Sequence, residues 1–358
     1  MISGGGTGGH IYPAISIAQA LKATLTNVEI LFVGAEGRME MKKVPEAGFK
    51  IEGLWISGLQ RKVSVDNLML PLKLVSSIRK SFRLIREFKP DVVIGVGGYA
   101  SGPLLYAASR RKIPTLIQEQ NSYAGLTNKW LSKRVDKICV AYDGLEKYFP
   151  KEKLVITGNP VRLDIQKVDR ASAYQYFNLD PNKKTILSLG GSLGARTINQ
   201  SILAQLEKLK ASDVQLVWQT GSFYYQDIMD QWDREQYPTI RVQDFIREMQ
   251  FAYNVADLVI SRAGALSIAE LMIMGKATVL VPSPNVAEDH QTLNAKALVG
   301  KEASVMVTDQ EAQEKLIPTA IQLLENDAQL AQLRENIAKL AKPRAAYEIA
   351  NEVIKLTE

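Results

Sequence analysis

The chain has 358 residues, more than one ordinary hydrophobic core contains, so two domains are expected. Apolar residues make up 46% of it and charged residues 23%, which excludes a disordered chain. The single cysteine, Cys139, excludes an internal disulfide and a cysteine metal cluster, and its apolar neighbours favour an inert buried thiol. No uncharged apolar run reaches the length of about 18 residues that a membrane-spanning helix needs, and no secretory leader is recognisable, so a cytoplasmic location is expected.

The net charge of +6 is concentrated between residues 61 and 90, which hold eight basic and two acidic residues. Basic groups beside leucine-rich sequence suit an anionic lipid face, so we expect residues 61–90 to contact a membrane, above all through residues 63–72. The alternative is a crossover helix that packs on a sheet, because four apolar residues recur at helical spacing: Val75, Ile78, Phe82 and Ile85. The interleaved residues are aliphatic and not aromatic, which argues against nucleic acid as a partner.

Taken in chain order, short apolar runs alternate with stretches of helix length. The first half contains five strand candidates, at residues 28–35, 91–98, 115–121, 137–143 and 153–159. After a break near residues 157–170, six more follow, at residues 185–191, 214–221, 240–245, 257–264, 277–282 and 303–308. Such alternation predicts an α/β fold with two doubly wound parallel sheets. We expect domains at residues 1–160 and 161–342, and a last helix at 343–358 that packs back on the first domain.

Five glycines lie between Gly4 and His10, and only three residues precede them, which suggests that upstream residues of a first strand are missing. The spacing Gly4-x-Gly6-x-x-Gly9 is that of a dinucleotide fingerprint, but the acidic residue that follows, Glu36, lies rather far along. Two further glycine loops, at residues 95–102 and 190–195, also follow apolar strands and open helices. Because helix N-termini attract phosphate, we expect phosphate groups to bind in both halves. The alternative is that some of these glycines only permit tight strand–helix packing.

The stretch from residue 257 to residue 295 is the most informative. A strand ends at Ser261 and a helix is expected to begin near Ser267, which places Glu270 in its first turn. A carboxylate there either gains from the helix dipole or accepts hydrogen bonds from both hydroxyls of a ribose. Residues 289–291 lead into another helix and offer amide and imidazole groups to the hydroxyls of a sugar. Arg262 is expected to bind either a diphosphate or a local carbonyl.

Seven segments together resemble a known family. In chain order they are GGGTGGHIYPA, GVGGYASGP, QEQNSYAGLTNKWL, GNPVR, GGSLGA, SRAGALSIAEL and DHQTLNA, spread from residue 2 to about residue 300. They resemble the motifs of the MurG family of bacterial glycosyltransferases (glycosyltransferase family 28). The resemblance implies two Rossmann-like domains of the GT-B type that face each other across a cleft, with the donor held by the C-terminal domain and the lipid acceptor by the N-terminal one.

The resemblance also implies an activity. The family moves N-acetylglucosamine, with inversion, from UDP-N-acetylglucosamine to undecaprenyl-pyrophosphoryl-muramyl-pentapeptide, which converts lipid I to lipid II in peptidoglycan synthesis. The enzyme would act at the cytoplasmic face of the cell membrane as a peripheral protein, and so serve cell shape and division. The sequence contains no Asp-x-Asp motif, so no metal or other cofactor is expected.

Site residues are implied motif by motif. His10 is the candidate catalytic base, because imidazole titrates close to neutral pH; the alternative is that it orders the glycine loop or binds the acceptor diphosphate. Ser192 would meet the donor diphosphate, Ile246 the uracil, Glu270 the ribose and Gln291 the N-acetylglucosamine. Asn121 and Arg162 would approach from the interdomain side, and Arg162 and Arg262 are candidates to stabilise the charge of the leaving diphosphate. The whole donor set is Thr7, Gly8, Gly9, Asn121, Arg162, Ser192, Ile246, Ala265, Leu266, Ser267, Ile268, Ala269, Glu270 and Gln291. The acceptor side would comprise Gly97, Gly98, Tyr99 and Ser101.

One departure from the family pattern and three rival functions remain. Gln118 stands where many members have histidine, which puts a direct acid–base role for that position in doubt. A related GT-B transferase could glycosylate diacylglycerol instead. A nicotinamide-dependent oxidoreductase could use the first glycine run, and a non-catalytic sensor could bind the sugar nucleotide without releasing UDP.

Overall fold

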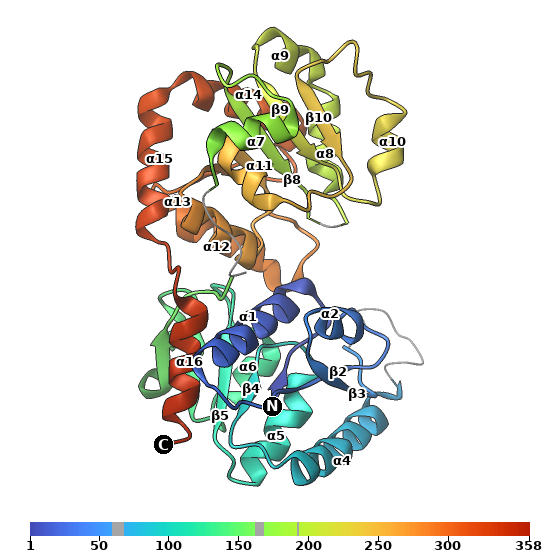
Figure 1. The fold of residues 1–358 in the computed structure, drawn as a ribbon, viewed down its shortest axis with the longest axis vertical. Helices are drawn as coiled ribbons and strands as arrows, with labels where there is room; N and C mark the ends of the chain where they lie inside the picture. Colours follow the sequence, from blue (N-terminus) through green and yellow to red (C-terminus); the bar gives the residue numbers. More distant parts are fainter. Residues whose placement is uncertain (59–67, 162–167, 192) are drawn as a thin grey trace. The chain divides into compact units, whose positions relative to one another are not determined.

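The structure is a computed structural model that describes residues 1–358 apart from 59–67, 162–167 and 192. The chain forms two compact units (Figure 1). The first unit consists of Met1–Arg162 and Lys342–Glu358, and the second of Leu163–Ala341. None of the helices in the described part combines the length and the apolar character that crossing a bilayer requires.

The first unit is built on a seven-stranded parallel sheet in the order β3-β2-β1-β4-β5-β6-β7. Its strands are β1 (Ile2–Ser3), β2 (Leu31–Ala35), β3 (Lys50–Leu54), β4 (Val93–Gly95), β5 (Thr115–Glu119), β6 (Lys137–Val140) and β7 (Leu154–Ile156). Its helices are α1 (Gly8–Thr24), α2 (Glu40–Glu46), α4 (Leu70–Phe88), α5 (Ser101–Arg110), α6 (Leu126–Leu131) and α16 (Ala345–Lys355), with 3-10 turns η1 (Leu145–Lys147) and η2 (Lys151–Lys153). The strand order changes direction between β1 and β4, where open α/β sheets commonly place ligands.

Each face of this sheet has its own hydrophobic core, because successive strand residues point to opposite sides. Ile117 and Ile138 face the core that α5 and α6 help to form, whereas Leu116 and Cys139 face the core that contains α1. Burial raises the pKa of the Cys139 thiol to about 12, and the predicted burial of this thiol is confirmed. The last helix, α16, packs against α1 and adds Ile349 to the second of these cores.

The expected apolar stripe on α4 is only partly right. Ile85 is buried, but Val75 is 47% exposed. The buried face instead includes Ser77 and Ser81, whose hydroxyls donate to the carbonyl oxygens of Trp55 (3.1 Å) and Ser77 (2.8 Å). The buried residues of α4 thus include these two serines together with Leu84 and Ile85, and Val75 lies outside this set.

The second unit is built on a six-stranded parallel sheet in the order β10-β9-β8-β11-β12-β13. Its strands are β8 (Thr185–Leu189), β9 (Gln215–Gln219), β10 (Ile240–Gln243), β11 (Leu258–Ser261), β12 (Ala277–Leu280) and β13 (Val305–Met306). Its helices are α7 (Arg170–Phe177), α8 (Arg196–Leu203), α9 (Leu206–Ala211), α10 (Tyr225–Met229), α11 (Met249–Val255), α12 (Ala265–Met274), α13 (His290–Val299), α14 (Ala312–Glu325) and α15 (Asp327–Lys339), with a 3-10 turn η3 (Ala287–Asp289). Here the order changes direction between β8 and β11. The predicted fold class, two doubly wound parallel sheets, is confirmed.

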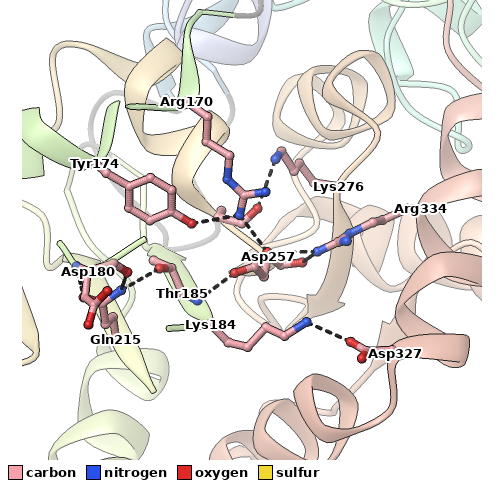
Figure 2. A network of polar contacts seen from close by, with 11 residues as sticks. Arg170, Tyr174, Asp180, Lys184, Thr185, Gln215, Asp257, Lys276, Asp327 and Arg334 are labelled. Carbon is pink, nitrogen blue, oxygen red and sulfur yellow. Dashed lines mark hydrogen bonds and ion pairs between the residues drawn. The ribbon is translucent and has the colours of Figure 1, made fainter. Parts of the chain in front are cut away.

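Asp257 organises the edge of the second sheet where β8 and β11 begin (Figure 2). Its carboxylate accepts a hydrogen bond from the backbone N–H of Thr185 (2.9 Å). It also forms ion pairs with Arg170 of α7 (2.9 Å) and Arg334 of α15 (3.3 Å). One buried carboxylate therefore holds two helices to the start of the second sheet, at the edge opposite to the carboxyl ends of its own strands.

Candidate active site

The loops after β1, β4 and β5 share the carboxyl edge of the first sheet, because these three parallel strands are neighbours. They carry residues 4–7, 96–100 and 120–125. The expected site residues of the first unit therefore lie along one edge, at the point where the strand order changes direction.

His10 lies in the first turn of α1, which follows Thr7 in extended conformation. Its Nδ1 is 3.1 Å from the carbonyl oxygen of Gly5 and 3.3 Å from the hydroxyl of Thr7. A carbonyl oxygen only accepts hydrogen bonds, so the contact with Gly5 requires a proton on Nδ1. In a neutral ring, Nε2 then carries the lone pair that a general base needs.

The glycines of the first loop are subject to different structural constraints. Gly6 has φ +86°, a left-handed conformation that favours glycine. A Cβ on Gly5 would lie 2.1 Å from Oε1 of Glu40. A Cβ on Gly8 or Gly9 would meet only nearby side-chain atoms, at 3.2 Å or more. The conformation and packing of the loop therefore require glycine at positions 5 and 6, whereas a ligand can approach the backbone closely at Gly8 and Gly9.

The second glycine loop packs directly against the first. Gly97 and Gly98 have φ +88° and +81°. A Cβ on Gly97 would lie 2.8 Å from the ring of His10, and one on Gly98 would lie 2.4 Å from the carbonyl oxygen of Gly5. The hydroxyl of Ser101 donates to the carbonyl oxygen of Gly98 (2.8 Å) and closes the loop. These residues, expected on the acceptor side, therefore also hold His10 in place.

Tyr99 lies over the first loop, with its ring 3.1 Å from the position of a Cβ on Gly6. Burial raises the pKa of the Tyr99 phenol, and nearby Arg38 opposes this shift while Glu40 adds to it. The phenol is therefore neutral near physiological pH and able to donate a hydrogen bond.

Asn121 is held by Glu119, a buried carboxylate at the end of β5. Oε1 of Glu119 accepts from the backbone N–H and side-chain amide of Asn121 (3.2 and 3.4 Å), and Oε2 accepts from the amide of Asn128 (2.9 Å). Gln118 is fully buried and donates to Asn159 (3.0 Å). This placement makes Gln118 a structural residue and agrees with the doubt about an acid–base role.

In the second unit, the glycine loop after β8 supports both interpretations of its glycines. A Cβ on Gly194 would lie 2.1 Å from the carbonyl oxygen of Thr220, and one on Gly190 would lie 2.6 Å from the backbone nitrogen of Ala195. These two glycines permit tight backbone packing. Gly191, by contrast, has φ +79° and open space where a Cβ would be. A phosphate can therefore approach the loop at Gly191, ahead of α8.

Gln219, buried at the end of β9, joins this loop to Ile246. Its amide donates to the carbonyl oxygen of Gly191 (3.1 Å), and its Oε1 accepts from the backbone N–H of Ile246 (3.0 Å). Because that N–H is engaged, a hydrogen bond from Ile246 to a uracil would have to use the carbonyl oxygen.

The expectation that Glu270 lies in the first turn of its helix is wrong. Gly264 is extended and acts as the N-cap, and its carbonyl oxygen accepts from the N–H of Ile268 (3.0 Å), so α12 begins at Ala265 and Glu270 falls in the second turn. The helix dipole therefore contributes less to Glu270. Instead, the hydroxyl of Tyr253 on α11 donates to Oε2 of Glu270 (2.7 Å) and orients the carboxylate.

Within residues 265–270, the side chains differ in what they can reach. Ile268 is fully buried, and Ala265 and Ala269 are almost so. Leu266, Ser267 and Glu270 are partly exposed. Any side-chain contact with a ligand from this stretch therefore falls to those three residues.

Gln291 lies at the start of α13, and its Oε1 accepts from the backbone N–H of Ser283 (2.9 Å). The two residues before α13, Glu288 and Asp289, have φ +54° and +51°. Left-handed conformations of non-glycine residues cost about 1–3 kcal/mol each and concentrate at functional sites. The strained turn holds Gln291 at the end of the loop that follows β12.

Arg262 takes the local role that the sequence left open. Its guanidinium donates to the carbonyl oxygens of Val281 (3.1 Å) and Pro282 (3.2 Å), and it forms an ion pair with Asp309. It braces the ends of β11 and β12, so the structure favours a bracing role over a diphosphate contact.

Two expected donor residues, Ser192 and Arg162, lie outside the described residues, as do residues 63–67 of the 63–72 segment. Within the described ranges, no three histidine, cysteine, aspartate or glutamate side chains are grouped so as to hold a metal ion.

Three residues that shape the site were missed by sequence reasoning: Glu40, Gln219 and Tyr253. Their contacts span 34, 27 and 17 residues, respectively, so no local spacing signals them. The dinucleotide pattern did direct attention to an acidic residue after the second strand, but to Glu36, which instead lies 3.6 Å from Lys80 on the surface.

Two doubly wound units, each with glycine loops at the carboxyl ends of its strands, define a two-domain α/β protein with loops suited to phosphate-bearing ligands. The chain belongs to glycosyltransferase family 28: residues 1–140 match the N-terminal domain of that family and residues 185–351 its C-terminal domain. The predicted family is thereby confirmed.

Curated relatives are similar over the whole chain. Proteins from Parabacteroides distasonis (55% identical, 100% of this chain and 98% of that protein) and Cytophaga hutchinsonii (56%, 99% and 96%) are both named UDP-N-acetylglucosamine–N-acetylmuramyl-(pentapeptide) pyrophosphoryl-undecaprenol N-acetylglucosamine transferase. The crystal structure of Acinetobacter baumannii MurG matches with a TM-score of 0.81 at 29% identity over 99% of both chains. A UDP-GlcNAc 2-epimerase from Neisseria meningitidis (TM-score 0.66, 17% identity, 99% of both chains) shares the fold alone.

Proposed function

We propose that this chain transfers N-acetylglucosamine from UDP-N-acetylglucosamine to N-acetylmuramyl-(pentapeptide) pyrophosphoryl-undecaprenol. The observation that carries the proposal is the full-length identity of 55% and 56% with proteins of that name. The contacts of Glu40 argue against a nicotinamide cofactor, because its carboxylate already accepts from Gly6 N–H (3.1 Å). A pyrophosphate at a dinucleotide fingerprint would need the amides of that loop.

The second unit would bind the donor. The Glu270 carboxylate, oriented by Tyr253, suits the ribose hydroxyls, and the carbonyl of Ile246 suits the uracil. The open backbone at Gly191 precedes α8, whose N-terminal partial charge would stabilise the departing diphosphate. Gln291 would meet the hydroxyls of N-acetylglucosamine.

The first unit would bind the acceptor and supply the catalytic base. Nε2 of His10 would take the proton from the acceptor hydroxyl, whose oxygen attacks C1 of the sugar as the bond from C1 to the UDP oxygen breaks. Attack from the face opposite the leaving group inverts C1. A well-placed base contributes a factor of about 10²–10⁴ to the rate. The backbone at Gly8 and Gly9 leaves room for the acceptor diphosphate.

The membrane contact would lie at the start of α4. Leu68, Leu72, Leu74 and Val75 are exposed by 78%, 61%, 43% and 47%, although large apolar side chains usually avoid water. Arg79 and Arg83 are exposed farther along the same helix. Apolar side chains beside basic ones suit the headgroup region of an anionic bilayer, and this contact would make the enzyme peripheral at the cytoplasmic face.

A transfer assay tests the activity. Labelled UDP-N-acetylglucosamine is offered with a lipid I analogue or with diacylglycerol, and sugar transfer and UDP release are measured. We expect transfer only to the lipid I analogue. Transfer to diacylglycerol alone would contradict the proposal, and binding of the nucleotide without UDP release would indicate a sensor.

Sedimentation with vesicles tests the membrane contact. We expect the protein to bind vesicles that contain anionic lipid, and the Leu72→Glu variant to bind them more weakly. Ile156→Glu is the matched control, because Ile156 is an exposed apolar residue (49%) on β7 of the same unit. Equal loss of binding in both variants would show that the added negative charge weakens binding wherever it lies, and would not support a contact at α4.

A further inference from the structure

The first glycine loop is anchored by a buried carboxylate. Glu40, the first residue of α2, is fully buried. Its Oε1 accepts from the backbone N–H of Ala35 (3.0 Å) at the end of β2, and its Oε2 accepts from the N–H of Gly6 (3.1 Å). One hydrogen bond to the end of β2 and one to the loop after β1 fix both oxygens of the carboxylate.

One peptide group connects this carboxylate to His10. The N–H of Gly6 and the C=O of Gly5 belong to the same planar trans peptide, so they point in opposite directions. The N–H points to Glu40, and the carbonyl oxygen lies 3.1 Å from Nδ1 of His10. The order is therefore carboxylate, peptide group, imidazole.

This order has a chemical consequence for the imidazole. Hydrogen bonds in a chain polarise one another, so a carboxylate at the N–H makes the carbonyl of the same peptide a better acceptor. The hydroxyl of Thr7, 3.3 Å from the same Nδ1, could instead donate to it and select the other tautomer. The strengthened Gly5 carbonyl favours a proton on Nδ1, which leaves the lone pair on Nε2.

We propose that Glu40 is a positioning residue that acts through the Gly5–Gly6 peptide to hold His10 in the Nδ1–H tautomer. In a Ser-His-Asp triad the carboxylate binds the imidazole directly, whereas here one peptide group stands between them. The tautomer is inferred from the contacts of Nδ1 and from the polarised Gly5 carbonyl, and its catalytic use rests on the proposed function.

The packing around this peptide supports the arrangement. A Cβ on Gly5 would lie 2.1 Å from Glu40, and a Cβ on Gly98 would lie 2.4 Å from the Gly5 carbonyl oxygen. Glycine is therefore needed at positions 5 and 98, because a side chain at either would displace the Glu40 carboxylate or the Gly5 carbonyl from this arrangement.

The tautomer can be measured directly, because the chain contains only two histidines, His10 and His290. Long-range ¹H–¹⁵N correlation spectra of the full chain labelled with ¹⁵N-histidine show which ring nitrogen carries the proton, and His290→Gln assigns the two rings. We expect neutral His10 to carry its proton on Nδ1. A proton on Nε2 in the unaltered protein would overturn the proposal without recourse to any variant.

The Glu40→Gln variant tests the relay. The amide keeps the shape, but one of the two N–H donors would face an NH₂ group. We expect His10 to lose its single tautomer, kcat to fall by about 10- to 100-fold, less than removal of a base costs, and the UDP dissociation constant to stay unchanged. Combination with His10→Ala should slow the reaction no further than His10→Ala alone.

Glu36→Gln is the matched control, because Glu36 is an exposed carboxylate in the turn that precedes α2, and the variant should leave tautomer and kcat unchanged. A folded Glu40→Gln variant with unaltered tautomer and kcat would refute the relay. The spectra need no substrate, so a failed transfer assay counts against the proposed function, whereas a wrong tautomer counts against Glu40.

Discussion

Replacing Glu270 by glutamine tests the donor site most directly. The variant keeps the size of the side chain but replaces one acceptor oxygen by an NH₂ donor. In the structure, Oε2 accepts from the hydroxyl of Tyr253 (2.7 Å), which holds the carboxylate in one orientation. If the carboxylate binds ribose hydroxyls, the variant loses charged hydrogen bonds that the protein has already oriented.

The size of the effect follows from the type of bond. A hydrogen bond to a charged group contributes about 1.5–3 kcal/mol, so Glu270→Gln should weaken UDP binding by about 10- to 150-fold. Tyr253→Phe keeps the carboxylate and removes only the bond that orients it, so it should weaken UDP binding less than Glu270→Gln does. Isothermal titration with UDP measures both dissociation constants.

Two further measurements separate ribose binding from general damage. Glu314→Gln, on the exposed surface of α14 in the same unit, should bind UDP as the unaltered protein does. The double variant Tyr253→Phe/Glu270→Gln should bind no more weakly than Glu270→Gln alone, because the tyrosine acts through the carboxylate. An unchanged UDP dissociation constant in Glu270→Gln would show that the ribose assignment is wrong.

Three other predictions concern the base and the two sheets. His10→Ala should lower kcat by about 10²–10⁴-fold without changing the UDP dissociation constant; unchanged kcat would remove it from the chemistry. In thermal unfolding, Gly98→Ala should be destabilised, because its Cβ would lie 2.4 Å from a carbonyl oxygen, whereas Gly102→Ala on α5, with its nearest atom at 3.6 Å, should gain up to about 1 kcal/mol. Similar melting temperatures would contradict this contrast. Asp257→Ala leaves the buried N–H of Thr185 without its acceptor and should lower the free energy of unfolding in urea by about 1–3 kcal/mol. UDP binding should be unchanged, because Asp257 lies at the edge of the sheet opposite to the glycine loop, and weaker UDP binding would contradict this.

The fold was predictable from the sequence because buried parallel strands are continuous apolar runs. All eleven predicted runs contain a strand, from β2 and β4 in the first unit to β13 in the second. β3 was missed because Lys50–Leu54 mixes charged and apolar residues at the edge of the sheet. The stripe on α4 was only partly right because periodicity counts apolar residues, whereas the buried residues of that helix also include Ser77 and Ser81.

The edge of each sheet on which the expected site residues lie was predictable, but the hydrogen bonds between them were not. Parallel strands bring their carboxyl ends to one edge, so glycine loops that follow strands indicate where ligands bind. Which side chain holds which loop depends on contacts between distant parts of the chain, as with Tyr253 and Glu270. The start of α12 was placed late because Gly264, taken as part of a turn, is the N-cap itself.

Four glycines of the first loop divide into two pairs, Gly5 with Gly6 and Gly8 with Gly9, and only the second pair leaves room for a ligand. Gly5 must lack a side chain because Glu40 occupies the adjacent space, and Gly6 because its φ is +86°. Both demands exist in the free protein. Gly8 and Gly9 face neither constraint and lie in the first turn of α1, whose amides a phosphate can approach. The acceptor diphosphate is therefore expected there and not at Gly6, which distinguishes this loop from a dinucleotide fingerprint of identical spacing.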